Sequence, residues 1–406
     1  MNREVYDVVI IGGGIAGLTA SAMFSKLGLD TLCVEPVEPP NDPDQINTDL
    51  RTTAFLWNSI EVLKNAEAWN SLKEHAEPLK GMRIIDSGGK NNQIRSAICF
   101  DATEINKPFF GCNIPNWITK KTLSSIIQER KNSKIIFGAK VKMILNRPND
   151  SNLLLSNNQK ISAKLVIGAD GRDSFVRNNA GIKVKKWSNG QRAIVFNVKH
   201  EKPHLNISTE IHKSGGPCTL IPLTNEFDGS FRSAVVWMEK NRKIDNLLKL
   251  GVDDFSAEVT SRTNYINGDC KLISERFSYP IVNQVAERFY GFRMALIAEA
   301  AHVMPPIGAQ GLNTSFEDIA KLAELLAKNM KNNVDIGCES MLRNFNRQRL
   351  AKTKSKILGI DILNKTSASD IQLIKDIRNL GLGFIDKSPR IRKILMQAGL
   401  GDLNIG

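Results

Sequence analysis

Three glycines near the start of the chain have the spacing of a phosphate-binding turn. Gly12, Gly14 and Gly17 form a G-x-G-x-x-G pattern. In such a turn the first glycine permits a tight bend, the second lets the backbone approach a diphosphate, and the third allows a helix to pack closely on a strand. The diphosphate would lie at the positive end of a helix that opens at Ile15 and Ala16.

The elements around this turn are those that a dinucleotide site requires. Residues 7–11 (DVVII) form a continuous apolar run, typical of a buried parallel strand. Residues 15–27 predict a helix, and residues 32–34 a second short strand. This strand ends at Glu35, 23 residues beyond Gly12, where a carboxylate can accept hydrogen bonds from ribose hydroxyls. We therefore predict that a βαβ unit at the N-terminus binds a dinucleotide.

Two further glycine-containing segments follow predicted strands. The apolar run 164–168 (KLVIG) leads into Asp170 and Gly171. A later segment precedes a helix expected over residues 316–326, so its last amides are suited to stabilise negative charge. In chain order its candidate site residues are Glu299, Pro305, Pro306, Gly308, Gln310, Gly311, Leu312 and Asn313.

With these motifs the chain resembles the class A flavoprotein monooxygenases, the para-hydroxybenzoate hydroxylase-like family, and within them the ubiquinone-biosynthesis hydroxylases. Asp49, Arg51 and Ala54 match the family's segment after the second strand, and residues 82–86 and 396–401 match later segments. The resemblance therefore covers nearly the whole chain. It implies FAD as cofactor and NAD(P)H as a co-substrate that binds without a second Rossmann domain.

The implied fold class is α/β, with a Rossmann-like FAD-binding domain interleaved with a substrate domain that is a mainly antiparallel β-sheet, followed by C-terminal helices. We expect a discontinuous FAD-binding domain over residues 1–75, 105–182 and 286–340. The substrate domain is expected over 76–104 and 183–285, where short β-branched segments alternate with turn residues. Residues 341–406 are expected to form a basic helical region.

The resemblance also implies roles for individual residues. Asp170 and Gly171 would serve both the FAD region and nicotinamide access, and Arg51 would contact the cofactor near its pyrophosphate or flavin. Pro305, Pro306, Gly308 and Gln310 would form the loop that faces the flavin, without a certain catalytic side chain among them. The family's Gly-Asp pair falls on Ala298 and Glu299, and Ser315 replaces a usual glycine; neither change removes a hydrogen-bonding group. His302 is expected to be a packing or hydrogen-bonding residue rather than a base.

The activity implied is hydroxylation of an aromatic ring of a ubiquinone precursor, a polyprenyl phenol, through a flavin C4a-hydroperoxide formed with O₂. Two other enzymes are compatible with the same scaffold: a hydroxylase of a soluble aromatic acid and a flavin-dependent prenyl reductase. A third hypothesis is that the chain is a non-catalytic flavin-binding subunit of a quinone-biosynthesis complex.

The composition of the chain bears on its location and on whether it binds a metal. Hydrophobic residues make up 42% of the chain, with no stretch long enough to cross a bilayer and no secretory signal. We expect a cytoplasmic protein, which could lie at the inner face of a membrane. The six cysteines and five histidines show no metal-ligand spacing, so no metal is expected.

The net charge of +13 is concentrated near the C-terminus, because residues 341–400 hold thirteen Lys and Arg against four Asp. This excess is equally typical of a solvated helical face and of a surface that docks to anionic lipid or to a biosynthetic complex. The apolar stretch over residues 357–363 could likewise be a core-facing helix or a membrane-surface segment. Nucleic acid is not expected, since no nucleic-acid-binding motif accompanies the basic residues.

Overall fold

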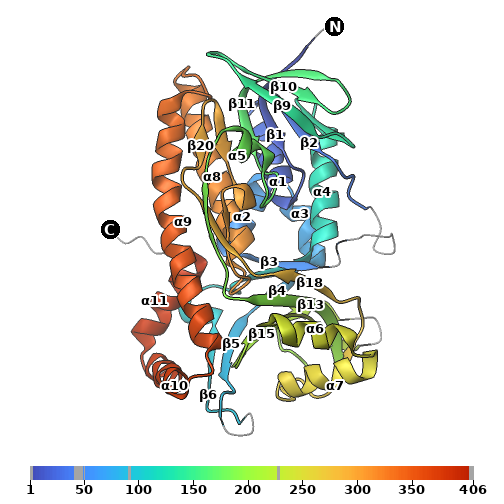
Figure 1. The fold of residues 1–406 in the computed structure, drawn as a ribbon, viewed down its shortest axis with the longest axis vertical. Helices are drawn as coiled ribbons and strands as arrows, with labels where there is room; N and C mark the ends of the chain where they lie inside the picture. The colour runs from blue at the N-terminus through green and yellow to red at the C-terminus, as the bar shows by residue number, and fades with distance from the viewer. Residues whose placement is uncertain (1–2, 41–48, 50, 90–92, 226–228, 402–406) are drawn as a thin grey trace.

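Two large sheets lie one above the other, and a long C-terminal helix runs beside both of them (Figure 1). This computed structural model describes residues 3–40, 49, 51–89, 93–225 and 229–401. Residue 1 and residues 402–406, which end two of the predicted regions, lie outside the described residues. Within these ranges no helix has the length and apolar character needed to cross a membrane.

The upper sheet in Figure 1 is built around the predicted first strand, β1 (Glu4–Ile11). β1 is flanked in parallel by β2 (Thr31–Glu35) and β11 (Lys160–Gly168). Because these strands are buried on both faces, their sequences are continuous apolar runs rather than alternating ones. The remaining strands of this sheet are the parallel β8 (Ser133–Phe137) and β21 (Met294–Leu296) and the antiparallel β9 (Val141–Asn146), β10 (Ser151–Leu155) and β20 (Tyr290–Gly291).

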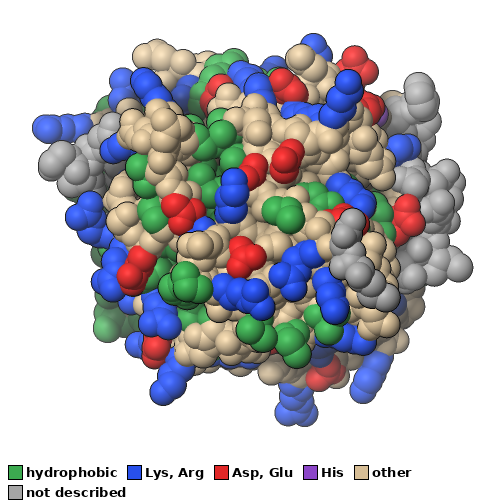
Figure 2. Space-filling model, turned by 90° about the horizontal axis from the view of Figure 1, so that it is seen from above, with side chains coloured by type: hydrophobic (Ala, Val, Ile, Leu, Met, Phe, Trp, Pro, Cys, Tyr) green, Lys and Arg blue, Asp and Glu red, His purple; other side chains and the backbone are tan. Residues whose placement is uncertain are grey.

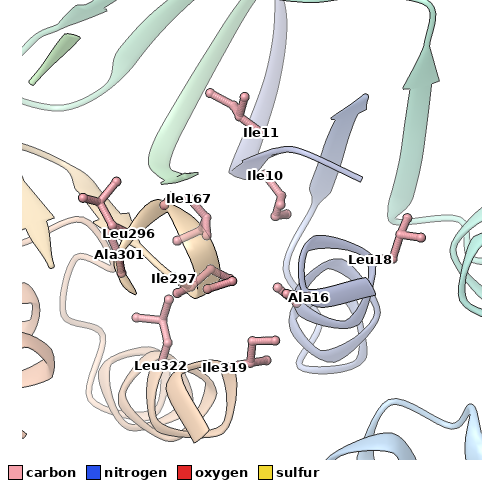
Figure 3. Close-up of a cluster of buried hydrophobic side chains, with 14 of the residues drawn as sticks. Ile10, Ile11, Ala16, Leu18, Ile167, Leu296, Ile297, Ala301, Ile319 and Leu322 are labelled. Atoms are coloured by element: carbon pink, nitrogen blue, oxygen red, sulfur yellow. The ribbon is translucent and has the colours of Figure 1, made fainter. Parts of the chain in front are cut away.

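Two helices that start at the candidate site pack against this sheet. Figure 3 shows Ile10 and Ile167 from the strands meeting Ala16 of α1 (Ile15–Lys26) and Ile319 of α8 (Gln310–Lys331). Ile10, Ile167 and Ile319 are fully buried. The other helices of this half are α2 (Trp57–Asn65), α3 (Trp69–Leu72), η1 (Lys73–His75), α4 (Asn116–Glu129), α5 (Phe175–Asn179) and η4 (Ala298–Ala300).

The lower sheet is mainly antiparallel, with one parallel pairing between β14 and β5. Its strands are β5 (Gly81–Asp86), β6 (Ser96–Asp101), β13 (Gln191–His200), β14 (Ile207–Lys213), β15 (Gly216–Leu223), β16 (Phe231–Lys240), β17 (Cys270–Leu272) and β18 (Phe277–Pro280). The sequence did not predict the two helices that cover one of its faces, α6 (Asn241–Lys249) and α7 (Val252–Arg262). They bury Ile244 and Phe255 against the sheet, which leaves the other face to the candidate site.

Short sheets and the C-terminal helices join the two halves. One sheet contains β3 (Thr52–Leu56), β4 (Glu77–Leu79) and β7 (Gly111–Pro115), and η3 (Ala102–Ile105) follows β6. Another contains β12 (Val184–Trp187), β19 (Asn283–Ala286) and β22 (His302–Val303). The helices are α9 (Glu339–Ala368), α10 (Gln372–Asp386) and α11 (Pro389–Leu400), as expected for the C-terminal region. The predicted domain boundaries stay predictions.

Candidate functional site

A large cavity lies between the two halves, with a volume of about 1660 Å³. A typical small-molecule site occupies about 300–1,000 Å³, so this cavity has room for more than one ligand. Residues from the first glycine turn, the β11–α5 turn, the β22–α8 loop, the lower sheet and all three C-terminal helices line it. Twelve predicted site residues are among them: Gly14, Ile15, Ala16, Arg51, Asp170, Gly171, Glu299, Pro306, Gly308, Gln310, Gly311 and Leu312.

The glycines of the first turn are required for two different reasons. Gly12 has a φ of +106°, and a Cβ there would overlap the carbonyl of Ala169. A Cβ on Gly17 would overlap the carbonyl oxygen of Gly12, so this glycine allows helix and strand to pack closely. A Cβ on Gly14, in contrast, would meet no atom within 4 Å. Packing within the protein therefore requires glycine at positions 12 and 17 but not at position 14. The open side of Gly14 lines the cavity.

Two helix N-termini face the cavity without a capping side chain. α1 follows Gly14 and α8 follows Ala309; neither helix has a side-chain cap or an acidic residue in its first turn. The first amides of each helix thus lack an intrahelical acceptor, and the positive end of each helix dipole is not neutralised by its own side chains. Such ends are suited to bind a diphosphate or a developing anion.

Glu35 lies directly behind the first turn rather than on the cavity wall. Its Oε2 accepts a hydrogen bond from the amide of Gly13 at 2.5 Å, and its Oε1 accepts one from Val37 at 3.1 Å. A carboxylate has about four acceptor positions, so Glu35 can still accept from a ribose hydroxyl.

Asp170 has a structural task that its motif did not reveal. Its carboxylate accepts hydrogen bonds from the Ser174 hydroxyl at 2.5 Å and from the Val176 amide at 3.0 Å. It therefore fixes the start of α5 and leaves the neighbouring Gly171, with a φ of +80°, on the cavity wall.

Arg51 is held by Asp49 in a bidentate ion pair of 2.6 and 2.9 Å. Burial alone would raise the pKa of Asp49, but hydrogen bonding and charge from Arg51 outweigh this and lower it. The phenol of Tyr279, which no sequence motif indicated, also lines the cavity, and burial raises its pKa. Arg51 and Glu299 line the same cavity as this phenol.

The loop that was predicted to face the flavin has a fixed shape. Gly308 and Ala309 have φ values of +59° and +56°, and Gln310 donates a hydrogen bond to the Gly399 carbonyl on α11 at 2.9 Å. Pro305 begins the loop but is not among the lining residues. Asn313 lies behind it, because its side chain donates to Ala54 and accepts from Leu56 of β3, both at 2.8 Å.

The unusual Ala298 has a φ of +55°, a conformation that favours glycine. His302, which lines the cavity nearby, donates from Nε2 to the fully buried Asp318 at 2.6 Å. His302 thus makes a hydrogen bond, as the sequence predicts.

Glu210 and His212 also line the cavity, and the sequence did not predict them. Their only signal in the sequence is their two-residue spacing on a strand.

These features fit FAD. The open space beside Gly14 and the uncapped α1 end suit a diphosphate, Glu35 suits a ribose, and the second helix end suits a ring that becomes negative when reduced. The fold and the site therefore define a dinucleotide-binding flavoprotein.

A model of the family described as "FAD binding domain" matches residues 5–355, so the chain belongs to that family. The Rhodospirillum rubrum protein "Ubiquinone hydroxylase UbiL" is 27% identical over 403 residues, covering 99% of this chain and 91% of its own. The Escherichia coli "3-demethoxyubiquinol 3-hydroxylase" is 23% identical and covers 99% and 100%, respectively. The crystal structure of p-nitrophenol 4-monooxygenase PnpA from Pseudomonas putida superposes with a TM-score of 0.78, at 15% identity and full coverage of both chains. The predicted fold class, the FAD cofactor and the flavoprotein monooxygenase class are confirmed.

We predict that Gly14→Ala impairs cofactor binding without impairing folding. The added methyl meets no protein atom but occupies the space beside the α1 amides, so FAD should bind roughly tenfold more weakly or worse. Gly17→Ala is the matched control, since its methyl overlaps the Gly12 carbonyl and should lower stability by about 1–3 kcal/mol. Flavin fluorescence titration and urea unfolding measure the two effects. Equal FAD affinity in Gly14→Ala and the unmodified protein would contradict the assignment.

A second prediction compares two alanines in η4. Ala298→Gly and Ala300→Gly remove the same buried methyl, but only Ala298 has a positive φ. Relief of the left-handed strain should leave Ala298→Gly about 1–2 kcal/mol more stable than Ala300→Gly. Denaturant unfolding of the two FAD-loaded proteins measures the difference, and equal stabilities would count against the strain.

Proposed function

We propose that this chain is an FAD-dependent, NAD(P)H- and O₂-using hydroxylase of the aromatic ring of a ubiquinone precursor, a polyprenyl phenol. The observation that carries the proposal is that the cavity continues from the cofactor turn over a mainly apolar sheet face and between the C-terminal helices. This extension suits an apolar tail attached to the ring. The two relatives named above, both of which act on ubiquinone-related compounds by their names, support the same substrate class.

The charges on the cavity wall favour a phenol over a soluble aromatic acid. Each Lys or Arg that lines the cavity, among the described residues, has a carboxylate within 4 Å, and this carboxylate would compete with a carboxylate on the substrate. The pairs are Arg51 and Lys120 with Asp49, Arg172 with Asp173, Lys356 with Glu317, and Arg378 with Asp86.

Bound FAD would supply hydride exchange with NAD(P)H and the activation of O₂. The amides of Ile15 and Ala16 would hold its diphosphate, and Glu35 would hold its ribose. Arg51 would contact it near its pyrophosphate or flavin. The amides of Gly311 and Leu312 would lower the energy of negative charge on its ring. Pro306 and Gly308 would shape the wall beside the ring, and the mainly apolar sheet face would orient the substrate and exclude water.

The proposal predicts coupled oxygen chemistry with a small probe, 2-prenylphenol. NAD(P)H consumption should match O₂ uptake, and mass spectrometry under oxygen-18 should find one labelled atom in the ring. 4-Hydroxybenzoate, which carries a carboxylate, should give far less product. Turnover without O₂ would instead support a prenyl reductase, and a chain that holds FAD but never oxidises NAD(P)H with any phenol would be a non-catalytic subunit.

We also propose that α10 docks on an anionic bilayer, from which a prenylated substrate would enter. One side of α10 lines the cavity with Ile374 and Leu382, while Leu373, Leu380 and Phe384 are each at least 66% exposed. A helix that is apolar on both sides is normally buried on both. α10 and α11 lie at the lower end in Figure 1.

Charge favours an anionic lipid surface over a neutral one. Residues 371–401 carry six Lys and Arg against two Asp, and Lys387 and Arg390 have no ion pair within the described part of the chain. The opposite end of the molecule instead shows basic and acidic side chains interspersed (Figure 2). Each Lys or Arg near an anionic surface contributes about 1 kcal/mol.

Replacing both Leu380 and Phe384 with Glu should abolish this docking. Burial of each side chain in lipid would contribute about 1.5–3 kcal/mol, so association with phosphatidylglycerol-containing vesicles should fall at least about tenfold. Val252→Glu, an exposed apolar residue on α7, is the control. Co-sedimentation with neutral and anionic vesicles measures binding, and turnover of 2-prenylphenol in solution should not change. Wild-type protein without a preference for anionic vesicles would refute the membrane contact.

A further inference from the structure

The cavity reaches the protein surface between the three C-terminal helices. α10 packs against both α9 and α11, and residues from all three helices line the cavity (Figure 1). Leu363, Ile377 and Leu395 are among these lining residues, although they are 56%, 60% and 42% exposed. An apolar lining that continues to the surface in this way marks a place where an apolar ligand can enter or leave.

Each of these helices also carries a glycine about one turn away from its exposed aliphatic residue. The pairs are Gly359 and Leu363 on α9, Ile377 and Gly381 on α10, and Leu395 and Gly399 on α11, and all six residues line the cavity. Residues four apart lie on the same face of a helix. Each helix therefore presents one glycine and one aliphatic side chain to the same opening. These six residues define the C-terminal opening.

Packing within the protein does not require these three glycines. A Cβ added to any of them would meet no atom within 4 Å. Gly359 and Gly381 lie inside helices, where glycine is less favourable than alanine by about 1 kcal/mol. Because the space beside them is open and belongs to the cavity, the missing side chains keep the C-terminal opening wide.

The C-terminal opening is attached to the loop that was predicted to face the flavin. The carbonyl of Gly399 accepts a hydrogen bond from the Gln310 side chain at 2.9 Å. The next carbonyl of α11, that of Leu400, accepts one from Asn58 of α2 at 2.9 Å. One side of the opening is thus fixed next to this loop. An aromatic ring bound at the loop would have the opening within reach of a substituent.

Few charges would oppose an apolar chain in the C-terminal opening. Within the described part of the chain, Lys356 and Arg378 are the only charged residues of α9, α10 and α11 that line the cavity. Lys356 forms an ion pair with Glu317 at 2.6 Å, and Arg378 forms one with Asp86 at 2.7 Å. Both cations already have a carboxylate partner, so an apolar chain would not have to separate an unpaired charge from water.

We infer that the polyprenyl tail of the substrate leaves the cavity through the C-terminal opening while the ring stays beside the flavin-facing loop. This inference rests on the proposed function and deepens it, because it names the residues that select the tail. Since the cavity need not enclose the whole tail, a longer tail should be tolerated. A side chain in place of any of the three glycines would narrow the opening and exclude long tails first.

The first test narrows the C-terminal opening from one side. Gly381→Leu adds a branched side chain there, and Gly381→Ala adds only a methyl group. Gly383→Leu is the matched control, because Gly383 lies on the same helix, also has open space at its Cβ and does not line the cavity. The substrates are 2-prenylphenol, which has a short tail, and 2-geranylgeranylphenol, which has a long one, both in detergent solution without vesicles.

Gly381→Leu should lower the ratio of kcat/KM for the long-tailed phenol to kcat/KM for the short-tailed phenol at least about tenfold. Gly381→Ala should lower this ratio less, and Gly383→Leu should leave it unchanged. FAD content and thermal unfolding identify variants that fold, and Gly359→Leu narrows the opening from α9 if Gly381→Leu does not. Equal ratios in wild type and in the folded, narrowed variants would overturn the inference.

A binding measurement separates this inference from the proposed function. Holoenzyme is irradiated with 2-geranylgeranylphenol that carries a benzophenone at the end of its tail, and mass spectrometry identifies the labelled peptides. The label should lie on α9, α10 or α11 next to the C-terminal opening, and Gly381→Leu should reduce it. If this holds but no phenol is hydroxylated, the proposed function fails and the tail path stands. Label on other elements, or equal labelling by a benzophenone fatty acid, would show that the opening does not select the prenyl tail.

Discussion

The buried charge of Asp318 is the constraint on which the rest of the site depends. Its carboxylate is fully buried on α8 and accepts hydrogen bonds from His302 at 2.6 Å and from Arg349 at 2.7 Å. Burial alone would raise the pKa of Asp318, but these two partners outweigh it and hold the pKa below its usual value. A buried charge without partners would cost several kcal/mol, so β22, α8 and α9 must stay together. The loop from Pro305 to Ala309 is thereby anchored at both ends.

Further along the chain, α9 makes polar contacts with segments next to the lower sheet. Beyond Arg349, Asp361 of α9 accepts hydrogen bonds from Asn189 and Asn283 at 2.9 and 3.0 Å. α10 is then attached to β5 through the ion pair of Arg378 and Asp86, with side chains 7% and 0% exposed. Figure 1 shows α9 beside both sheets. The cavity between the sheets is therefore bounded by a helix whose two halves are fixed by buried polar contacts.

Much of the cofactor half could be predicted because its constraints are local in sequence. Gly12 and Gly17 contact each other or the adjacent β11 turn, so their spacing alone specifies the turn. The continuous apolar strands follow from burial on both faces. The role of Asn313 could not be predicted in this way, because its partners are in β3, more than 250 residues earlier. The pair of Glu210 and His212 could not be predicted from the sequence either, because any strand places residues two apart on one face.

Ala298 and Glu299 replace the family's Gly-Asp pair. The contacts that hold this segment explain the replacement better than a loss of function does. Sequence alone identifies the departure, but only the structure shows that the alanine keeps the left-handed backbone that a glycine would adopt without strain. Such strain persists only where neighbouring contacts over-determine the conformation. The Ala298 amide lies 3.4 Å from the Asp318 carboxylate, and Ile297 donates to the Gly168 carbonyl at 3.0 Å. Because the segment is held from both sides, the methyl group changes local stability while Glu299 stays on the cavity wall, so the substitution gives no support to a non-catalytic subunit.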